Sequence, residues 1–306
     1  MHNFFELPLK VVFIVGSCRS GKTSIGRLIS TSKNAEFIDE PPLLVSLPIL
    51  SKIGRIAKKE AISMFQSYLR ELVFDVVLMR RSNFRPYDDS SIWKTTSVDE
   101  ILMRISLKRK KDAYSYISDY GFTVVISLPN NIGNIDFISE AHPGSKIIKV
   151  VRNGANVADL TREKSWFSDL NLISGFEELV ISKFMDSNDN AWNLPWWVDD
   201  SDRGVFLGFS EYERGLYYWC QTNKFTKSSS KLPNVFSVSF ENFINEILIT
   251  KHDIFNFLEI KGSSMTNVVE LELSKYKNIS DVDDSSYNIE NLLKIKYKEI
   301  VKENYG

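Results

Sequence analysis

The residues with the clearest chemical meaning form the loop Gly16–Thr23, which fits the pattern G-x-x-x-x-G-K-[ST]. In this pattern the glycines let consecutive backbone N–H groups point inward, and the following helix adds the positive end of its dipole. Such a loop holds a phosphate group. Its lysine and its final hydroxyl, here Lys22 and Thr23, are the groups that contact the phosphate chain and a metal ion in nucleotide-dependent kinases.

The flanking sequence supplies the elements that this loop needs. Residues 11–15 are all apolar and mostly β-branched, which is typical of a buried parallel strand. After the loop, Ile25, Leu28 and Ile29 recur at helical spacing. The order strand, loop, helix favours a true phosphate site over a chance glycine turn.

Two carboxylates follow the next short strand. Residues 35–38 have strand character, and Asp39, Glu40 and two prolines come directly after them. A kinase of the phosphate-loop type needs a second strand that ends in a metal-binding aspartate. Only Asp39 stands at such a position, and Glu-Pro-Pro follows it at once. The kinase signal is therefore incomplete.

The composition of the chain excludes several classes of function. The 306 residues contain 43% hydrophobic residues and carry a net charge of -1, so no global field attracts nucleic acid or an anionic membrane. The two cysteines provide neither a disulfide framework nor a metal quartet. The first apolar run is too short for a signal peptide or a membrane span. We expect a cytoplasmic protein without a membrane span.

Alternating strands and helices predict the fold class. Further β-rich runs occur at 122–127, 146–151 and 234–240, each leading into helix-like sequence. We expect a three-layer α/β/α domain, similar to phosphate-loop NTPases, with a central parallel five-stranded sheet. The predicted helices cover 57–80, 243–258 and one segment from Ser97 to just before Gly121, with Ser97 and Glu100 as a capping box. A single domain, 1–306, would carry a helical insertion at about 165–230.

Several motifs together resemble the sulfotransferases that use 3′-phosphoadenosine 5′-phosphosulfate (PAPS), including those that act on carbohydrates and on tyrosyl proteins. The run Arg19-Ser-Gly-Lys-Thr-Ser24 resembles the family's Arg-Ser-Gly-Thr-Thr loop, and Asp39-Glu-Pro41 resembles its acidic element. The segment 146–158, a strand that ends in Arg152-Asn-Gly before a helix, is similar to the second family signature. Pro129-Asn-Asn131 and Tyr218-Trp219 are also similar in order and spacing.

The resemblance implies a donor site. The loop would bind the 5′-phosphosulfate of PAPS through Ser17, Cys18, Arg19, Ser20, Gly21, Lys22, Thr23 and Ser24. Arg152 would bind the 3′-phosphate, with contributions from Thr161 and Lys164. The product would be 3′-phosphoadenosine 5′-phosphate (PAP), and no metal is implied. The alternative role for Arg152 is a surface salt bridge.

The chemistry assigns roles to three residues of this site. Sulfuryl transfer resembles phosphoryl transfer, in which positioning and charge stabilisation do most of the work. Arg19 matches the family's loop cation beside the leaving group, and Lys22 adds a second positive charge where negative charge grows. Glu40 matches the acidic position and is the predicted general base, because none of the three histidines lies beside a motif. The alternative is that Glu40 pairs with Arg19 and orders the loop.

The chain departs from the family pattern at three positions. Leu160 stands where a serine usually contacts the 3′-phosphate, so either Thr161 substitutes or the contact is lost. Ser127 replaces a lysine that many relatives place near the sulfuryl group, whereas Lys22 replaces a threonine. We hypothesise that Lys22 supplies the cation that Ser127 cannot.

The acceptor is the least defined part. Trp192, Trp196 and Trp197 precede Asp199 and Asp200, a combination suited to stacking on a sugar ring, although such tryptophans also pack cores. The loop 83–89 either lines the acceptor side or is an ordered surface loop.

The predicted function is transfer of a sulfuryl group from PAPS to a hydroxyl of a carbohydrate or glycoconjugate. The alternatives are a kinase that uses ATP and Mg²⁺, and a non-catalytic PAP-binding protein.

Overall fold

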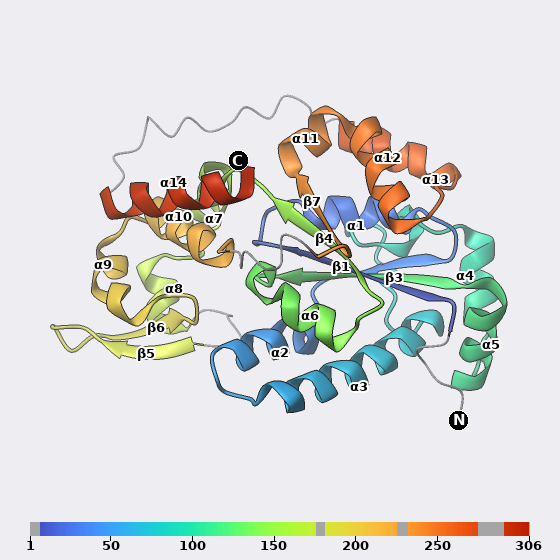
Figure 1. Ribbon diagram of the computed structural model, residues 1–306, viewed down its shortest axis with the longest axis horizontal. Helices are drawn as coiled ribbons and strands as arrows, with labels where there is room; N and C mark the ends of the chain where they lie inside the picture. The colour runs from blue at the N-terminus through green and yellow to red at the C-terminus, as the bar shows by residue number, and fades with distance from the viewer. Residues whose placement is uncertain (1–6, 176–180, 225–231, 275–290, 306) are drawn as a thin grey trace.

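A five-stranded parallel sheet forms the centre of the molecule (Figure 1). The computed structural model describes residues 7–175, 181–224, 232–274 and 291–305. In spatial order the strands are β2 (Ala35–Ile38), β3 (Phe122–Pro129), β1 (Leu9–Gly16), β4 (Lys146–Val151) and β7 (Val235–Ser239). The predicted fold class is confirmed, with the five strands at the predicted places.

The central position of β1 in the sheet explains its continuous apolar sequence. It pairs in parallel with β3 along its whole length and with β4 from Val12 to Val15. Val11, Phe13 and Val15 enter one hydrophobic cluster, whereas Val12 and Ile14 enter the cluster on the opposite face. Side chains alternate across a strand, so a strand buried on both faces needs apolar residues at every position.

Helices cover both faces of the sheet. One face carries α2 (Pro42–Lys52), α3 (Lys58–Val77), α5 (Lys110–Tyr120) and α6 (Ile135–Ala141). The other carries α1 (Lys22–Ser30), α11 (Phe240–Asn245), α12 (Ile247–Leu258) and α13 (Ser264–Leu273). Figure 1 shows α3 on one side of the sheet and α12 and α13 on the other. Among the helices in the described ranges, none has the length and apolar character needed to cross a bilayer.

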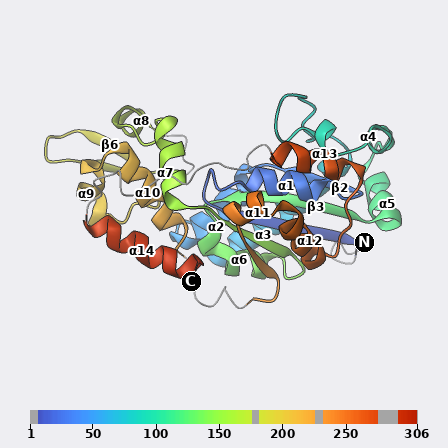
Figure 2. The ribbon, with the colours of Figure 1, turned by 90° about the horizontal axis from the view of Figure 1, so that it is seen from above.

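A third hydrophobic cluster lies beyond the carboxyl ends of the strands, at the left of Figure 2. It is built by α7 (Gly154–Glu163), α8 (Asp169–Ser174), β6 (Ala191–Pro195), α9 (Arg203–Gly208), α10 (Glu211–Thr222) and α14 (Asn291–Tyr305). The insertion predicted at about 165–230 contains helices, but it also contains an antiparallel hairpin of β5 (Ile181–Met185) and β6. Residues 176–180 and 225–230 of the insertion lie outside the described part.

The helix predicted from Ser97 to Gly121 is wrong as a single element. It is divided into α4 (Val98–Ile105) and α5, with a break at residues 106–109. The Asp112 carboxylate accepts the backbone N–H groups of Lys108 and Arg109 at 3.1 and 2.9 Å, which caps a new helix start. The Ser97 hydroxyl accepts the Glu100 N–H at 3.3 Å and caps α4 as expected.

A buried ion pair fixes the strand that leads to Asp39. The side chain of Arg104, on α4, is fully buried and its guanidinium donates to the Glu36 carboxylate of β2. The same guanidinium donates to the Val76 carbonyl at 2.7 Å. Removing one partner of a buried pair leaves an uncompensated charge, so α4 and the end of α3 hold β2 in a fixed place. The positions of Asp39 and Glu40, which directly follow β2, are therefore fixed as well.

Candidate functional site

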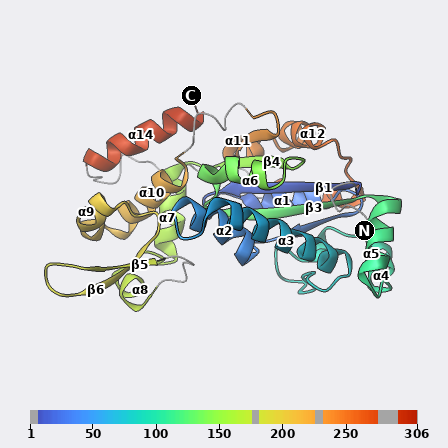
Figure 3. The ribbon, with the colours of Figure 1, turned by 60° about the horizontal axis from the view of Figure 1, so that its bottom comes forward.

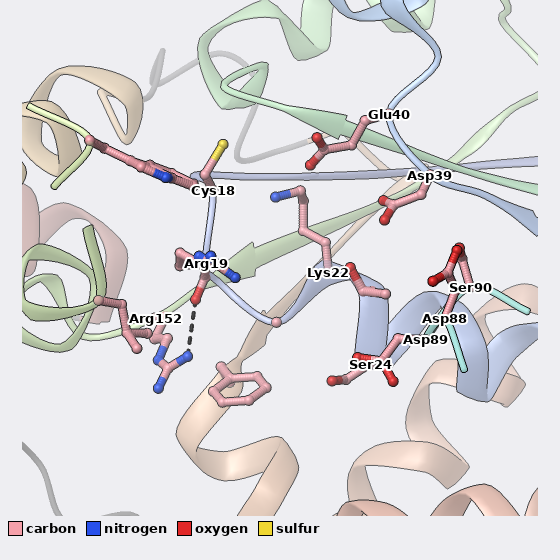
Figure 4. A pocket seen from close by; sticks show the side chains of 15 residues that line it. Cys18, Arg19, Lys22, Ser24, Asp39, Glu40, Asp88, Asp89, Ser90 and Arg152 are labelled. Atoms are coloured by element: carbon pink, nitrogen blue, oxygen red, sulfur yellow. Dashed lines mark hydrogen bonds between the residues drawn. The ribbon is translucent and has the colours of Figure 1, made fainter. Parts of the chain in front are cut away.

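A cavity of about 680 Å³ lies at the carboxyl ends of β1, β2 and β4. Ligands bind at this edge in open parallel sheets. Figure 4 shows its lining at close range. We call this cavity the main pocket. Its lining residues are Cys18, Arg19, Gly21, Lys22, Thr23, Ser24, Asp39, Glu40, Asp88, Asp89, Ser90, Arg152, Leu160, Trp166 and Phe240.

The loop at the pocket floor has the backbone form that phosphate binding requires. Gly21 precedes α1 with a φ of 92°, and Arg19 has a φ of 63°. At Gly16 a Cβ atom would lie 2.6 Å from Ser20 Oγ and 2.7 Å from the Val150 carbonyl oxygen, so only glycine fits there. The first N–H groups of a helix have no intrahelical acceptor. At α1 they are therefore available to an anion.

Side chains from two other elements hold this loop. The Tyr218 hydroxyl of α10 accepts the Cys18 N–H at 2.7 Å and donates to Asn130 Oδ1 at 2.6 Å. The Asn130 N–H in turn donates to the Gly16 carbonyl at 2.8 Å. The motifs Pro129-Asn-Asn131 and Tyr218-Trp219 do not by themselves predict this contact between their side chains. Both are positioning residues for the loop.

Lys22 and Asp39 form the inner wall of the main pocket. Only 4% of Lys22 is exposed, and its Nζ donates to the Ser17 carbonyl at 2.8 Å. The Asp39 carboxyl faces the pocket, but the surrounding protein removes much of its hydration, and this burial raises its pKa above the ordinary value. The negative charge of Glu40 raises that pKa further, whereas Lys22 and the hydroxyls of Ser127 and Thr23 lower it.

Glu40 also lines the pocket and is held differently from Asp39. Its backbone has a left-handed φ of 48°, a conformation that is costly for a glutamate and is found at functional sites. Among the described residues its carboxylate makes no hydrogen bond or ion pair. The predicted alternative, an ion pair with Arg19, does not form. The Arg19 guanidinium instead lies 5.1 Å from the ring centroid of Trp166.

Arg152 follows β4 and reaches the main pocket from the side opposite Asp39 (Figure 4). Its Nη1 donates to the Arg19 carbonyl at 3.0 Å, and its Cζ lies 4.7 Å from the ring centroid of Phe240. The Trp219 indole N–H donates to the Arg152 carbonyl at 2.9 Å. These contacts aim the guanidinium along the loop, which is where an anion would sit.

Four of the predicted donor-site residues do not line the pocket. Ser17 and Ser20 are fully buried beneath the loop. Thr161 is buried as well, with its hydroxyl donating to the Ala158 carbonyl at 2.9 Å and directed toward Gly215 of α10. Lys164 is exposed outside the pocket. The Thr161 side chain therefore does not face the main pocket, and Leu160 lines the pocket wall instead.

The loop predicted for the acceptor side does reach the pocket. Asp88, Asp89 and Ser90 line it on the same side as Asp39 and on the side away from Arg152 (Figure 4). Asp89 Oδ1 lies 3.6 Å from Arg27 Nη1 and 3.5 Å from Lys94 Nζ. The main pocket thus has a cationic part, formed by Arg19, Lys22 and Arg152, and a part lined by carboxylates.

The tryptophans of the insertion have separate positions. Trp197 is 3% exposed and packs in the third cluster, as the core alternative predicts. Trp192 donates its Nε1–H to Asp186 Oδ2 at 2.9 Å on the hairpin. Trp196 lines a second cavity. Only Trp166 among these aromatic residues lines the main pocket, and nothing in its sequence context singled it out.

No protein-family model and no curated protein sequence matches the chain. Among solved structures, it is similar to the sulfotransferase domain from the curacin biosynthetic pathway, with 13% identity, 96% of each chain covered and a TM-score of 0.48. It is also similar to a sulfotransferase from Alicyclobacillus acidocaldarius, with 15% identity, 95% and 92% coverage and a TM-score of 0.40. A mouse sulfotransferase complexed with PAP has 12% identity, 96% and 84% coverage and a TM-score of 0.40. Likenesses at this level establish no activity for this chain.

Proposed function

We propose that the protein is a PAPS-dependent sulfotransferase that transfers a sulfuryl group to a hydroxyl of a carbohydrate or glycoconjugate. The observation that carries this proposal is the convergence of Arg19, Lys22 and Arg152 on one pocket, beside the Glu40 carboxylate, which has no partner among the described residues. The three cations suit a donor that carries several negative charges, because they stabilise the negative charge that grows on its leaving group. The carboxylate suits the removal of a proton from a hydroxyl.

The pocket fits a bisphosphorylated nucleotide. Its volume of about 680 Å³ suits a ligand of that size. The loop residues from Cys18 to Ser24 would hold the 5′-phosphosulfate, and Arg152 would hold the 3′-phosphate. When bound, PAPS supplies the activated sulfuryl group.

The chain's own residues would divide the remaining work. Arg19 and Lys22 place positive charge where the leaving oxygen becomes negative, which lowers the barrier for an in-line displacement. Asp39 orients Lys22 and Thr23, since its carboxylate interacts with both. Glu40, with no competing partner in the described structure, takes the proton of the acceptor hydroxyl. The acceptor would approach past the carboxylates of Asp88 and Asp89.

The Glu40→Gln variant should lower kcat by a factor on the order of 10² to 10⁴, because it removes the general base but keeps the side-chain shape. It should also lower the pKa of Asp39, because a neighbouring negative charge that disfavours the Asp39 carboxylate is gone. Steady-state kinetics measures the first effect and an NMR titration of the Asp39 carboxyl carbon measures the second. A variant with full kcat and a lowered Asp39 pKa would assign Glu40 to electrostatics alone.

A specific observation supports the kinase as second candidate. Asp39 interacts with Thr23 and lies near Lys22, as the metal-binding aspartate of a phosphate-loop kinase would. Among the described residues, no group of three or more His, Cys, Asp or Glu side chains is arranged to hold a metal.

The third candidate is a PAP-binding protein without catalytic activity. Leu160 in the pocket wall and Ser127 behind it support this candidate, because both replace polar or charged residues of the family pattern.

Transfer of radiolabelled sulfur from PAPS to an oligosaccharide, measured in excess EDTA, tests the proposed function. We expect label transfer at the same rate with and without EDTA, since the cations of the pocket are side chains. Transfer of the γ-phosphate of ATP that stops in EDTA would support the kinase.

We propose the cytoplasm as the location of the protein. Cys18 and Cys220 are both free thiols, which suits a reducing compartment.

A further inference from the structure

A second cavity, of about 430 Å³, lies at the opposite end of α2 from Glu40. We call it the α2-end pocket; the residues that matter here are Arg55, Trp196, Asp199, Asp200 and Arg203. Helix α2 starts two residues after Glu40, and its 11 residues span about 16 Å. Figure 3 shows α2 running from the carboxyl ends of the strands, next to the β5–β6 hairpin. One helix therefore links the two pockets.

Two polar donors of this pocket lack acceptors. Trp196 packs against two of the hydrophobic clusters, so its ring is held firmly. Its indole Nε1–H is buried and has no hydrogen-bond acceptor among the described residues, and the same holds for Nε of Arg203. A buried donor without an acceptor is costly and calls for an explanation. Both nitrogens lie behind the pocket wall, so the part of Trp196 that a ligand in the pocket would meet is its ring.

The charges around the pocket favour an anionic group on that ligand. Asp199 is already compensated, because its carboxylate accepts Gln221 Nε2 at 2.6 Å and lies 3.2 Å from Lys224 Nζ. Asp200 accepts from Arg203 at 2.6 Å. Arg55 is exposed at the rim and makes no ion pair with any described residue. Among the described residues that line this pocket, the Arg55 guanidinium is therefore the cation that no carboxylate neutralises.

We propose that the α2-end pocket binds an acidic saccharide unit of the acceptor, with Arg55 on its carboxylate or sulfate group and Trp196 beneath its ring. An aromatic face together with carboxylate acceptors for hydroxyl groups suits a sugar, and the guanidinium adds recognition of the acid. The choice of a saccharide rests on the proposed function. The binding itself requires no sulfuryl transfer, so the two can fail separately.

Calorimetric titration with a tetrasaccharide of alternating glucuronic acid and N-acetylglucosamine, without nucleotide, tests this site. We expect Arg55→Ala to weaken binding by about ten- to a hundredfold, as for loss of a charge-assisted contact. The matched control Arg70→Ala, on an exposed arginine of α3, should change nothing. A neutral tetrasaccharide of N-acetylglucosamine should bind more weakly and should not respond to Arg55→Ala. The indole N–H resonance of Trp196, assigned with Trp196→Phe, should shift on titration.

Equal affinities of wild type, Arg55→Ala and Arg70→Ala would overturn this inference, and so would an unmoved Trp196 resonance or an absence of binding. If the saccharide binds with the expected dependence but no sulfur is transferred from PAPS, the proposed function fails and the α2-end pocket remains. If sulfur is transferred to short acceptors but Arg55→Ala binds the tetrasaccharide normally, only the pocket proposal fails.

Discussion

The Lys22→Met variant is expected to lose a factor of about 10² to 10³ in kcat, the usual cost of removing one group that stabilises developing charge. Lys22 is nearly fully buried and lines the main pocket at the start of α1. Methionine keeps most of its apolar stem, so the fold should persist. Because this charge matters most in the transition state, the affinity for PAP should fall far less than kcat.

Lys164→Met is the matched control for Lys22→Met. Lys164 was also predicted to contact the donor, but its side chain lies outside the main pocket. Its replacement should leave both kcat and the affinity for PAP unchanged. Equal losses in the two variants would contradict the geometry, and an unchanged kcat in Lys22→Met would sink the idea that Lys22 compensates for Ser127.

The second large effect is expected on stability. Gly21→Ala should lower the free energy of unfolding by about 2 to 4 kcal/mol, because two costs add. Gly21 has a φ of 92°, which costs alanine about 1 kcal/mol, and an added methyl group would overlap the Phe240 ring. Urea denaturation measures the change.

Gly54→Ala separates these two costs. Gly54 has a φ of 73°, and nothing lies within 4 Å of an added Cβ atom. It should therefore show only the backbone cost of about 1 kcal/mol. Equal destabilisation by both substitutions would mean that the Phe240 ring moves away from the added methyl group at little cost in free energy. A larger effect at Gly21 would show that Phe240 and the Arg152 guanidinium above it form a rigid wall of the main pocket.

The elements that follow from local pattern were predictable. The apolar run of β1 and the glycines of the loop indicate a strand and a tight turn before a helix without tertiary information, and the structure has both. The hairpin of the insertion was not foreseen, although a signal exists. The run Asp186–Asn190 is rich in turn residues, and Asp186 Oδ1 accepts the N–H groups of Asn188 and Asn190 at 2.8 and 2.9 Å.

The remaining misses depend on packing between distant segments. Whether Leu160 or Thr161 faces the pocket depends on the rotation of α7, which is set by its close approach to Gly215 of α10. The break between α4 and α5 depends on Asp112 capping a helix where the sequence reads as continuous. The role of Trp166 depends on Arg19 reaching it across the pocket. No spacing rule within one segment reports such contacts.

The central claim is a site for a 3′-phosphorylated nucleotide, and calorimetric binding of PAP against ATP with Mg²⁺ tests it most directly. We predict that PAP binds far more tightly than ATP with Mg²⁺. Arg152→Ala should then cost about 1.5 to 3 kcal/mol of PAP binding, while Arg162→Ala, an exposed arginine of α7 paired with Asp159, should cost nothing. Tighter binding of ATP with Mg²⁺, with Arg152→Ala indistinguishable from wild type, would contradict the sulfotransferase site and favour the kinase.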